Sequence, residues 1–445
     1  MLDTSDLKLA EEFPPVSTAE WEATIRADLK GADYDKKLVW RTDEGIAVRP
    51  YYRAEDTAGL PPVPARSTQD WTLMASGAQP PDGAIRADRF GENGATSVQE
   101  LGYGIAEAVE RIVTGGADSI VLVLSVGSNF FFEIAKPRAA RVLWAQVCEV
   151  VDKPVALSVQ ARTALSNKSI IDPYTNMLRA TTEALSAAIG GVDALEVEAF
   201  GFPARLALNI QRVLKEESYL DRVIDPAAGS YYVEVLTSSL AAEAWKLVRQ
   251  VEADGGFANA KPAIDQAIAE SRAAKEKAVA SRRRTLVGVN NYPDINERLD
   301  LNQPAPAKTW RVAAIFEQIR LRSERQAAKT GTRPSVLLLT HGDVKMRMAR
   351  AQFCQNFFGC GGFAIHEANH LEGAPDLVIL CSSDPEYVAL AQEICAATKA
   401  PVIVAGNPKE QMEALNAAGV KGYVHILSNA AETLTYWQNQ LGFPE

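Results

Sequence analysis

Cysteine and acidic side chains are among the groups in this sequence that could bind a metal ion or act as nucleophiles. The five cysteines lack the paired Cys/His spacing of a zinc site, so we predict buried, reduced thiols at Cys148, Cys354, Cys360, Cys381 and Cys395. A second group, Glu216, Glu217, Asp221 and Asp225, forms no metal-binding pattern. The sequence therefore predicts no metal site, and unpaired thiols favour a cytoplasmic protein.

Charged residues also gather in the segment 127–147, GSNFFFEIAKPRAARVLWAQV. Glu133 and Lys136 are three positions apart, which places them on one face of a helix and allows an ion pair. Arg141 lies eight positions after Glu133 and five after Lys136, and these spacings do not place it on that face. The same segment contains Asn129 and Arg138, and we interpret the whole set as structural.

Composition excludes several classes of protein. The net charge of −10 argues against a nucleic-acid surface, which needs clustered Lys and Arg. The densest basic run, Ser281 to Arg284, is interpreted as a solvated helix end. No apolar run reaches the length of about 18 to 20 residues that spans a membrane, and the acidic N-terminus MLDTSDLKLAEEF lacks a signal-peptide pattern.

Helices and strands that must position these residues can be predicted along the chain. A capping box at Ser17–Glu20 begins a helix that Gly31 ends, and the strand-like segment VWRTDEGIAVRPYYRAED follows. Prolines at 61, 62 and 64 then break regular structure. Between Trp71 and Thr237 short apolar runs alternate with helical patterns, and a second capping box is predicted at Ser97–Glu100.

This alternation indicates parallel βα units. The predicted strands are DWTLMA, GAIRADRF, SIVLVLSV, PVALSVQ and ALEVEAF, and helices are predicted from about Val98, Phe131, Tyr174 and Ala204. A closed eight-unit barrel typically needs about 250 residues. The 167 positions from Trp71 to Thr237 supply only five strands.

The rest of the chain divides into a helical part and a second sheet. Residues 238–286 are predicted to be helical with a hinge at Gly255–Gly256, and residues 287–334 form an irregular and then helical connector. The runs SVLLLT, FAIH, DLVILC, PVIVAG and GYVHI predict a flavodoxin-like doubly wound sheet. Helix starts are predicted at Ser383–Glu386 and Asn407–Glu410. We expect an arm at 1–65, a βα domain at 66–240, a connector at 241–333 and the second sheet at 334–445.

Three ordered blocks, 127–147, 171–191 and 224–237, resemble the acyl-CoA-binding barrel of methylmalonyl-CoA mutases. In that resemblance DWTLMASG matches the first barrel strand and GAIRADRFGENGAT the fifth, so about half a barrel is missing between them. The implied fold class is α/β, with a partial (half) TIM-type βα barrel followed by a flavodoxin-like domain similar to the cobalamin-binding domain. An open parallel sheet exposes its edges, so we expect it to bind a partner or to close against a second copy. The resemblance also implies that the N-terminal arm reaches across to a partner chain, and the alternative is a helix that packs on its own barrel.

The resemblance places cofactor contacts in the second sheet, but the residues differ. Cobalamin-binding relatives carry Asp-x-His-x-x-Gly after the first strand; here Asp343 keeps the Asp position, Lys345 replaces the cobalt-binding His and Met348 replaces the Gly. A Lys ammonium has no lone pair to donate until it loses its proton, near pKa 10.4 when unperturbed. His341 is four positions out of register and is interpreted as packed or exposed. Ser382 and Gly406 occupy two further cofactor-lining positions as remnants, so we expect no cofactor in this chain.

The substrate positions of the barrel differ in the same way. The resemblance places Asp88 and Arg89 where active members have the Tyr and His that contact the thioester, and Gln160 where they have a further His. Arg89 cannot act as a neutral hydrogen-bond donor, and we predict that Asp88 and Arg89 form local salt bridges. We therefore expect no catalytic residue in this chain.

Three functional hypotheses remain. The first is a small, non-catalytic subunit whose large partner subunit binds adenosylcobalamin and interconverts methylmalonyl-CoA and succinyl-CoA in a heterodimer. The second is an interaction or regulatory module without a mutase partner, whose flavodoxin-like domain binds another small ligand. The third, an independently active mutase for another acyl-CoA, requires new roles for His341 and Lys345 and ranks last.

Overall fold

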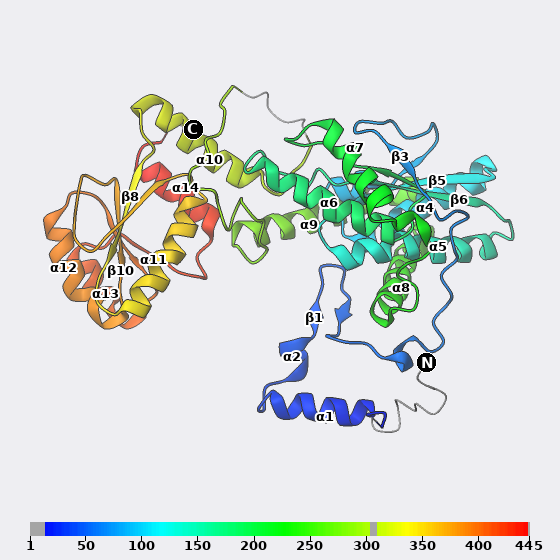
Figure 1. Cartoon of the computed structure of the whole chain (residues 1–445), viewed down its shortest axis with the longest axis horizontal. Helices are drawn as coiled ribbons and strands as arrows, with labels where there is room; N and C mark the ends of the chain where they lie inside the picture. Colours follow the sequence, from blue (N-terminus) through cyan, green and yellow to red (C-terminus); the bar gives the residue numbers. More distant parts are fainter. Residues whose placement is uncertain (1–13, 303–308, 444–445) are drawn as a thin grey trace, which may run out of the picture.

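The protein consists of two lobes and an N-terminal arm, as Figure 1 shows for a computed structural model that describes residues 14–302 and 309–443. One lobe contains the first parallel sheet and the other contains the second, with the arm lying apart from both sheets. The acidic N-terminal sequence and the PAPAK end of the connector lie outside the described residues. Within the described ranges, no helix is long and apolar enough to cross a membrane.

The arm begins with helix α1 (Thr18–Asp28), and its predicted capping box is confirmed because Ser17 and Glu20 cap each other reciprocally. Helix α2 (Tyr34–Leu38) and an antiparallel pair, β1 (Trp40–Arg41) and β2 (Ala47–Val48), follow, so only short pieces of the strand-like segment are strands. No residue of α1 is buried. The Trp40 ring contacts Phe132 edge-on at 5.8 Å between centroids, which joins the root of the arm to the first lobe.

All five strands predicted for the first lobe are present, in the order β3-β7-β6-β5-β4 and all parallel. Their bounds are β3 (Thr72–Met74), β4 (Ile85–Arg86), β5 (Ser119–Val126), β6 (Ala156–Thr163) and β7 (Ala194–Glu196). The two edge strands are short, with three residues in β3 and two in β4. Short edges limit the backbone that is left unpaired.

A loop of ten residues, 75–84, joins the two edges of this sheet. Since β3 and β4 are parallel, the chain must return from the carboxyl end of β3 to the amino end of β4 on the opposite edge. The loop therefore crosses from one edge of the sheet to the other.

The helices of this lobe pack against the first sheet or against one another. Their bounds are α3 (Asp88–Glu92), α4 (Ser97–Gly115), α5 (Phe130–Val150), α6 (Pro173–Ile189), α7 (Ala204–Arg212), α8 (Tyr231–Ala253) and α9 (Phe257–Ala280). Gly104 lets α4 lie close to the sheet, because a Cβ there would be 2.6 Å from the Cβ of Ala87. Helix α8 packs along α4 and α5, so the boundary expected after residue 240 falls inside a helix that belongs to this lobe.

Two details of the first lobe differ from the sequence prediction. Thr96 and Gln99, not Ser97 and Glu100, form the capping box of α4, and Glu100 is buried instead. The basic run after α9 is not simply solvated. Arg282 donates hydrogen bonds to Asn291 and Asn356, and its guanidinium lies 5.5 Å from the ring centroid of Phe357 in the second lobe.

The second lobe has five parallel strands in the order β12-β11-β10-β8-β9. Numbered along the chain this order is 2-1-3-4-5, as in flavodoxin-like doubly wound sheets. The strands are β8 (Ser335–Thr340), β9 (Ala364–Ala368), β10 (Leu377–Cys381), β11 (Val402–Ala405) and β12 (Gly422–Val424). The helices are α10 (Ala314–Thr330), α11 (Val344–Gly359), α12 (Tyr387–Ala397), α13 (Met412–Ala418) and α14 (Ala430–Gln440).

Alternate side chains of these strands face two apolar layers. Val336 and Leu338 pack with residues of α10, α11 and α14, while Leu337 and Leu339 pack with α12 and α13. The capping box at Ser383 and Glu386 is confirmed. The predicted cap at Asn407 is wrong, because Pro408 precedes that helical turn and no side chain caps it.

Candidate functional site

Charged side chains from three strands meet at the carboxyl end of the first sheet, where parallel βα folds place their ligands. Arg162 of β6 forms ion pairs with Glu196 of β7 (Nε to Oε2, 2.8 Å) and with Glu198 just beyond it. Asp88, at the start of α3, is 3.5 Å from the Arg162 Nη1. Arg86 binds the same Asp88 carboxylate through two hydrogen bonds of 2.8 and 2.6 Å. Each charged group in this network therefore has an oppositely charged partner from within the chain.

The network also fixes the loop that crosses the sheet. Glu196 Oε1 accepts hydrogen bonds from the backbone N–H groups of Gly77 (2.6 Å) and Ala78 (3.1 Å), and Ser76 donates to Glu198. Burial raises the pKa of Glu196 to about 7, and the nearby charge of Glu198 adds to this effect. A buried glutamate that titrates near neutrality is typical of functional sites, but here its acceptor atoms hold the loop.

The three residues expected at substrate positions do not converge on one point. Asp88 is only 3% exposed and belongs to the arginine network. Arg89 points to α4 instead, where it forms a 2.8 Å ion pair with Glu107. Gln160 lies on β6, and its buried Oε1 has no hydrogen-bond partner among the described residues. Asp88 and Arg89 thus both form salt bridges, each with its own partner.

Sequence analysis missed Arg162, Glu196 and Glu198. The signal available was their spacing, because Gln160 and Arg162, like Glu196 and Glu198, are polar residues at alternate positions in otherwise apolar strands. That period of two places each pair on one face of the sheet.

The charged residues of segment 127–147 hold helices together. Buried Lys136 forms ion pairs with Glu133 (2.7 Å), as predicted, and with Glu100 of α4 (2.9 Å). Arg138 binds Asp225 and Glu234, so Asp225 is an ion-pair partner. Among the residues that the structure describes, no cluster of His, Cys, Asp and Glu could hold a metal ion.

In the second lobe, the expected cofactor positions surround the switch point between β8 and β10. Asp343 caps α11 by accepting a 2.8 Å hydrogen bond from the Met346 N–H, and Lys345 is exposed on the first turn. Met348 is 61% exposed, and His341 is exposed as well. Ser382 is buried and its hydroxyl donates to Glu386 at 2.6 Å.

Two side chains of the lobe fill the space above these loops. Arg350 donates to Tyr387 (3.0 Å) and pairs with Asp384 (2.6 Å), and a Cβ at Gly406 would lie 1.9 Å from its Nη1. Glu386 accepts hydrogen bonds from the hydroxyls of Ser382 and Ser383, which lower its pKa to about 2. The carboxyl end of this sheet is therefore closed by internal hydrogen bonds.

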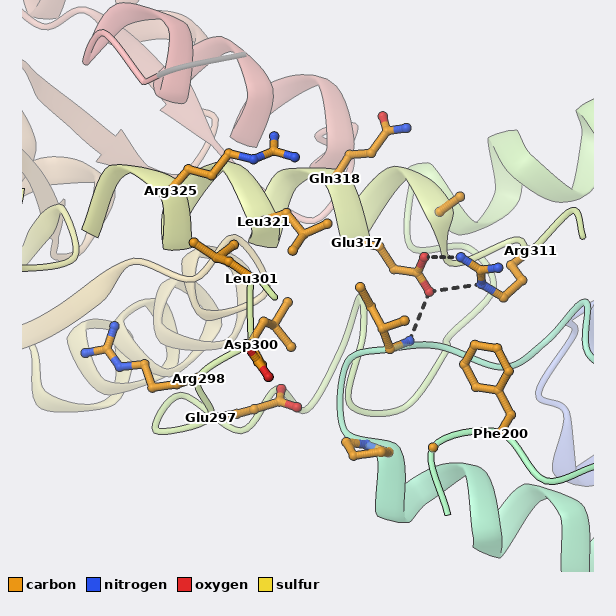
Figure 2. A pocket seen from close by; sticks show the side chains of 15 residues that line it. Phe200, Glu297, Arg298, Asp300, Leu301, Arg311, Glu317, Gln318, Leu321 and Arg325 are labelled. Atoms are coloured by element: carbon orange, nitrogen blue, oxygen red, sulfur yellow. Dashed lines mark hydrogen bonds and ion pairs between the residues drawn. The ribbon is translucent and has the colours of Figure 1, made fainter. Parts of the chain in front are cut away.

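A cavity of about 630 Å³ lies between the lobes, lined by the loops after β6 and β7, the connector and α10 (Figure 2). Glu317 binds Arg311 (2.7 Å) and accepts a hydrogen bond from the Ile170 N–H, and Arg311 lies over the Phe200 ring. These contacts connect α10 to the carboxyl end of the first sheet. Glu297 at the cavity accepts from the backbone N–H of Asp172, so it too is engaged internally.

Fold and site define a two-lobed α/β protein in which two parallel sheets carry charged or polar networks at their carboxyl ends. The family model for methylmalonyl-CoA mutase matches residues 42–334. The methylmalonyl-CoA mutase small subunit of Porphyromonas gingivalis is 32% identical over 98% of this chain and 99% of that protein. This chain belongs to the methylmalonyl-CoA mutase family.

Other relatives match over shorter stretches. The small subunit of Streptomyces virginiae is 34% identical over 79% of this chain and 63% of its own length. A methylmalonyl-CoA mutase of Rhizobium meliloti is 36% identical over 54% of this chain and 37% of that protein. The alignment with the Porphyromonas gingivalis protein spans 615 positions and this chain has 445 residues, so at least 170 positions have no counterpart here.

Proposed function

We propose that this chain is the small supporting subunit of an adenosylcobalamin-dependent methylmalonyl-CoA mutase. A large partner subunit would carry out the interconversion of methylmalonyl-CoA and succinyl-CoA. The match to a relative named as a small subunit over 98% of the chain carries this proposal. The five cysteines, all free thiols, favour the cytoplasm as its compartment.

The first lobe is proposed to be a shortened barrel. Its strand order, with the first strand beside the last and the second at the far edge, is what remains when consecutive βα units are removed after the first strand of a barrel. The 170 or more unmatched positions of the alignment support an internal shortening. The loop 75–84, fastened by Glu196, takes the place of the missing units.

Substrate chemistry is proposed to be absent from this lobe. Arg162 is held among three carboxylates, and Arg89 is directed toward Glu107 on a helix. Neither arginine is placed to polarise a thioester together with Gln160. We therefore assign this network to holding the shortened sheet together.

The second lobe does not fit cobalamin. Lys345 stands where the resemblance requires a cobalt-binding imidazole, and it is an exposed ammonium group on the first turn of α11. Arg350 and Glu386 occupy the space over Gly406 and Gly342 that a nucleotide tail would need. We propose that any cofactor resides in the partner subunit, to which the arm and the first lobe would bind.

Co-expression with a large mutase subunit tests this proposal. We expect the two chains to elute together in size-exclusion chromatography and to carry cobalamin absorbance only when the large subunit is present. Cobalamin absorbance retained by this chain alone would contradict the proposal, as would separate elution of the two chains.

A further inference from the structure

A cavity of about 440 Å³ opens at the amino end of the first sheet, the end opposite to the Arg162 network. Its walls are the strap 64–68, the helix α5 at Arg141, Trp144 and Ala145, the first residues of β6, and Asp193. This volume is within the range of small-molecule sites. The charged groups in its lining are two arginines and one aspartate.

Arg66 is the first of these arginines, and it is 6% exposed. Its guanidinium donates to backbone carbonyls only: Nε to Ile224 (3.1 Å), Nη1 to Val192 (3.1 Å), and Nη2 to Gln69 and to Val223 (3.3 Å). No carboxylate among the described residues forms a salt bridge with it. Burial lowers the pKa of Arg66 by more than the nearby charges of Asp193, Asp70 and Asp225 raise it, so the loss of solvation is not fully compensated.

Arg141 is the second arginine, and it is 8% exposed. Its Nη2 donates to the Gly191 carbonyl (2.6 Å) and to Asp193 (3.1 Å), whereas Nε and Nη1 have no hydrogen-bond partner in the described part of the chain. Asp193 also accepts a 2.7 Å hydrogen bond from the Val159 N–H. Neighbouring Arg138 is neutralised by its own two carboxylates. The cavity therefore has one positive charge in excess and three N–H donors of Arg141 without partners.

We propose that this cavity binds a small oxyanion, the phosphate or carboxylate group of a small metabolite. The planar donors of Arg141 match the two oxygens of such a group, and the buried charge of Arg66 would strengthen the attraction in a poorly solvated site. The hydroxyls of Ser67 and Ser158, which also line the cavity, add possible donors. The site lies away from the carboxyl ends of both parallel sheets, and the proposal does not depend on a mutase partner.

The test is isothermal titration calorimetry of the full chain with inorganic phosphate and, separately, with malonate, in chloride buffer of matched ionic strength. We expect saturable binding of at least one anion, and the tighter of the two identifies the head group. Ala145→Glu puts a carboxylate on the exposed rim of the cavity and should weaken binding at least about fivefold. Gln146→Glu adds the same charge at the next exposed position, outside the lining, and should change affinity less than about twofold.

Arg141→Lys keeps the charge but removes the planar donors, and it should also weaken binding. The absence of saturable binding of either anion up to about 10 mM would overturn the proposal. Equal effects of Ala145→Glu and Gln146→Glu would overturn it as well, since binding would then respond only to net charge.

Discussion

Arg162 of β6 and Glu196 of β7 are register partners on adjacent parallel strands, and their side chains form an ion pair of 2.8 Å. Through Glu196 this pair reaches the backbone of the loop 75–84, and through Arg162 it reaches Asp88 at the far edge of the sheet. A single arginine and its glutamate partner thus connect both edges of a five-stranded sheet whose edge strands, β3 and β4, do not pair with each other. These charges hold β6, β7, the loop 75–84 and the start of α3 together.

Glu196 should make stability depend on pH. Its pKa is raised from 4.5 to about 7, so the folded state holds this proton more tightly than the unfolded state. The stability it contributes is therefore greatest at low pH and is lost as pH rises toward 7. We expect the difference in unfolding free energy between wild type and Glu196→Gln to fall between pH 5 and 7, by at most about 1.4 kcal/mol per pH unit. Urea denaturation of both proteins across this pH range measures the difference. A difference that does not change with pH would contradict the raised pKa of Glu196.

Lys136→Met should destabilise the first lobe strongly. It leaves Glu100 and Glu133 buried without their shared cation, a change that typically costs about 3 to 5 kcal/mol. Lys246→Met is the control, because Lys246 is 67% exposed and should contribute less than about 0.5 kcal/mol. The shift of the urea unfolding midpoint, followed by tryptophan fluorescence, compares the two. Similar shifts for both variants would contradict this prediction, because the buried ion pairs of Lys136 would then contribute no more to stability than the exposed ion pair of Lys246.

Gly342→Ala should destabilise the second lobe more than Gly373→Ala. Both glycines have positive φ, 71° and 66°, so both substitutions cost about 1 kcal/mol in backbone strain. Only at Gly342 would the new Cβ meet another group, the Glu386 carboxylate at 2.0 Å, whereas nothing lies within 4 Å of Gly373. Displacing Glu386 from its hydrogen bonds to Ser382 and Ser383 should add a further loss of stability. Thermal unfolding of the two variants gives the comparison, and equal losses would show that the Glu386 contacts are dispensable.

Restoring two family residues should not restore cobalamin binding. Lys345→His combined with Met348→Gly restores the residues that the proposed correspondence with cobalamin-binding relatives requires, but Arg350 still occupies the space over Gly406 and Glu386 still bonds to Ser382. We expect no corrinoid absorbance to elute with this double variant after incubation with hydroxocobalamin. If corrinoid absorbance elutes with the double variant, Lys345 and Met348 alone prevent cobalamin binding.

Apolar runs were sufficient to predict the strands of both lobes. Parallel strands buried on two faces are continuous hydrophobic segments, and SIVLVLSV corresponds to β5 from Ser119 to Val126 without a shift. Caps were less certain because neighbouring residues compete. Thr96 and Ser97 each precede a suitable partner by three positions, and only the three-dimensional structure shows that Thr96 is used.

The arginine network could not be predicted because it depends on register. Arg162 and Glu196 are 34 positions apart, and their contact requires β6 and β7 to be adjacent with these two residues aligned. The role of Arg350 is similarly hidden, since its hydrogen bond to Ala405 joins a helix to a strand 55 positions later. Local patterns carry no information about such pairings.

The strand order has a consequence for synthesis of the chain on the ribosome. β3 pairs only with β7, and its partner for Thr72 is Ala194. The three strands β4, β5 and β6 can therefore assemble as they emerge, while β3 must wait for more than a hundred further residues before it has a neighbour. Such long-range pairing slows folding, so the strand that is made first joins its sheet last.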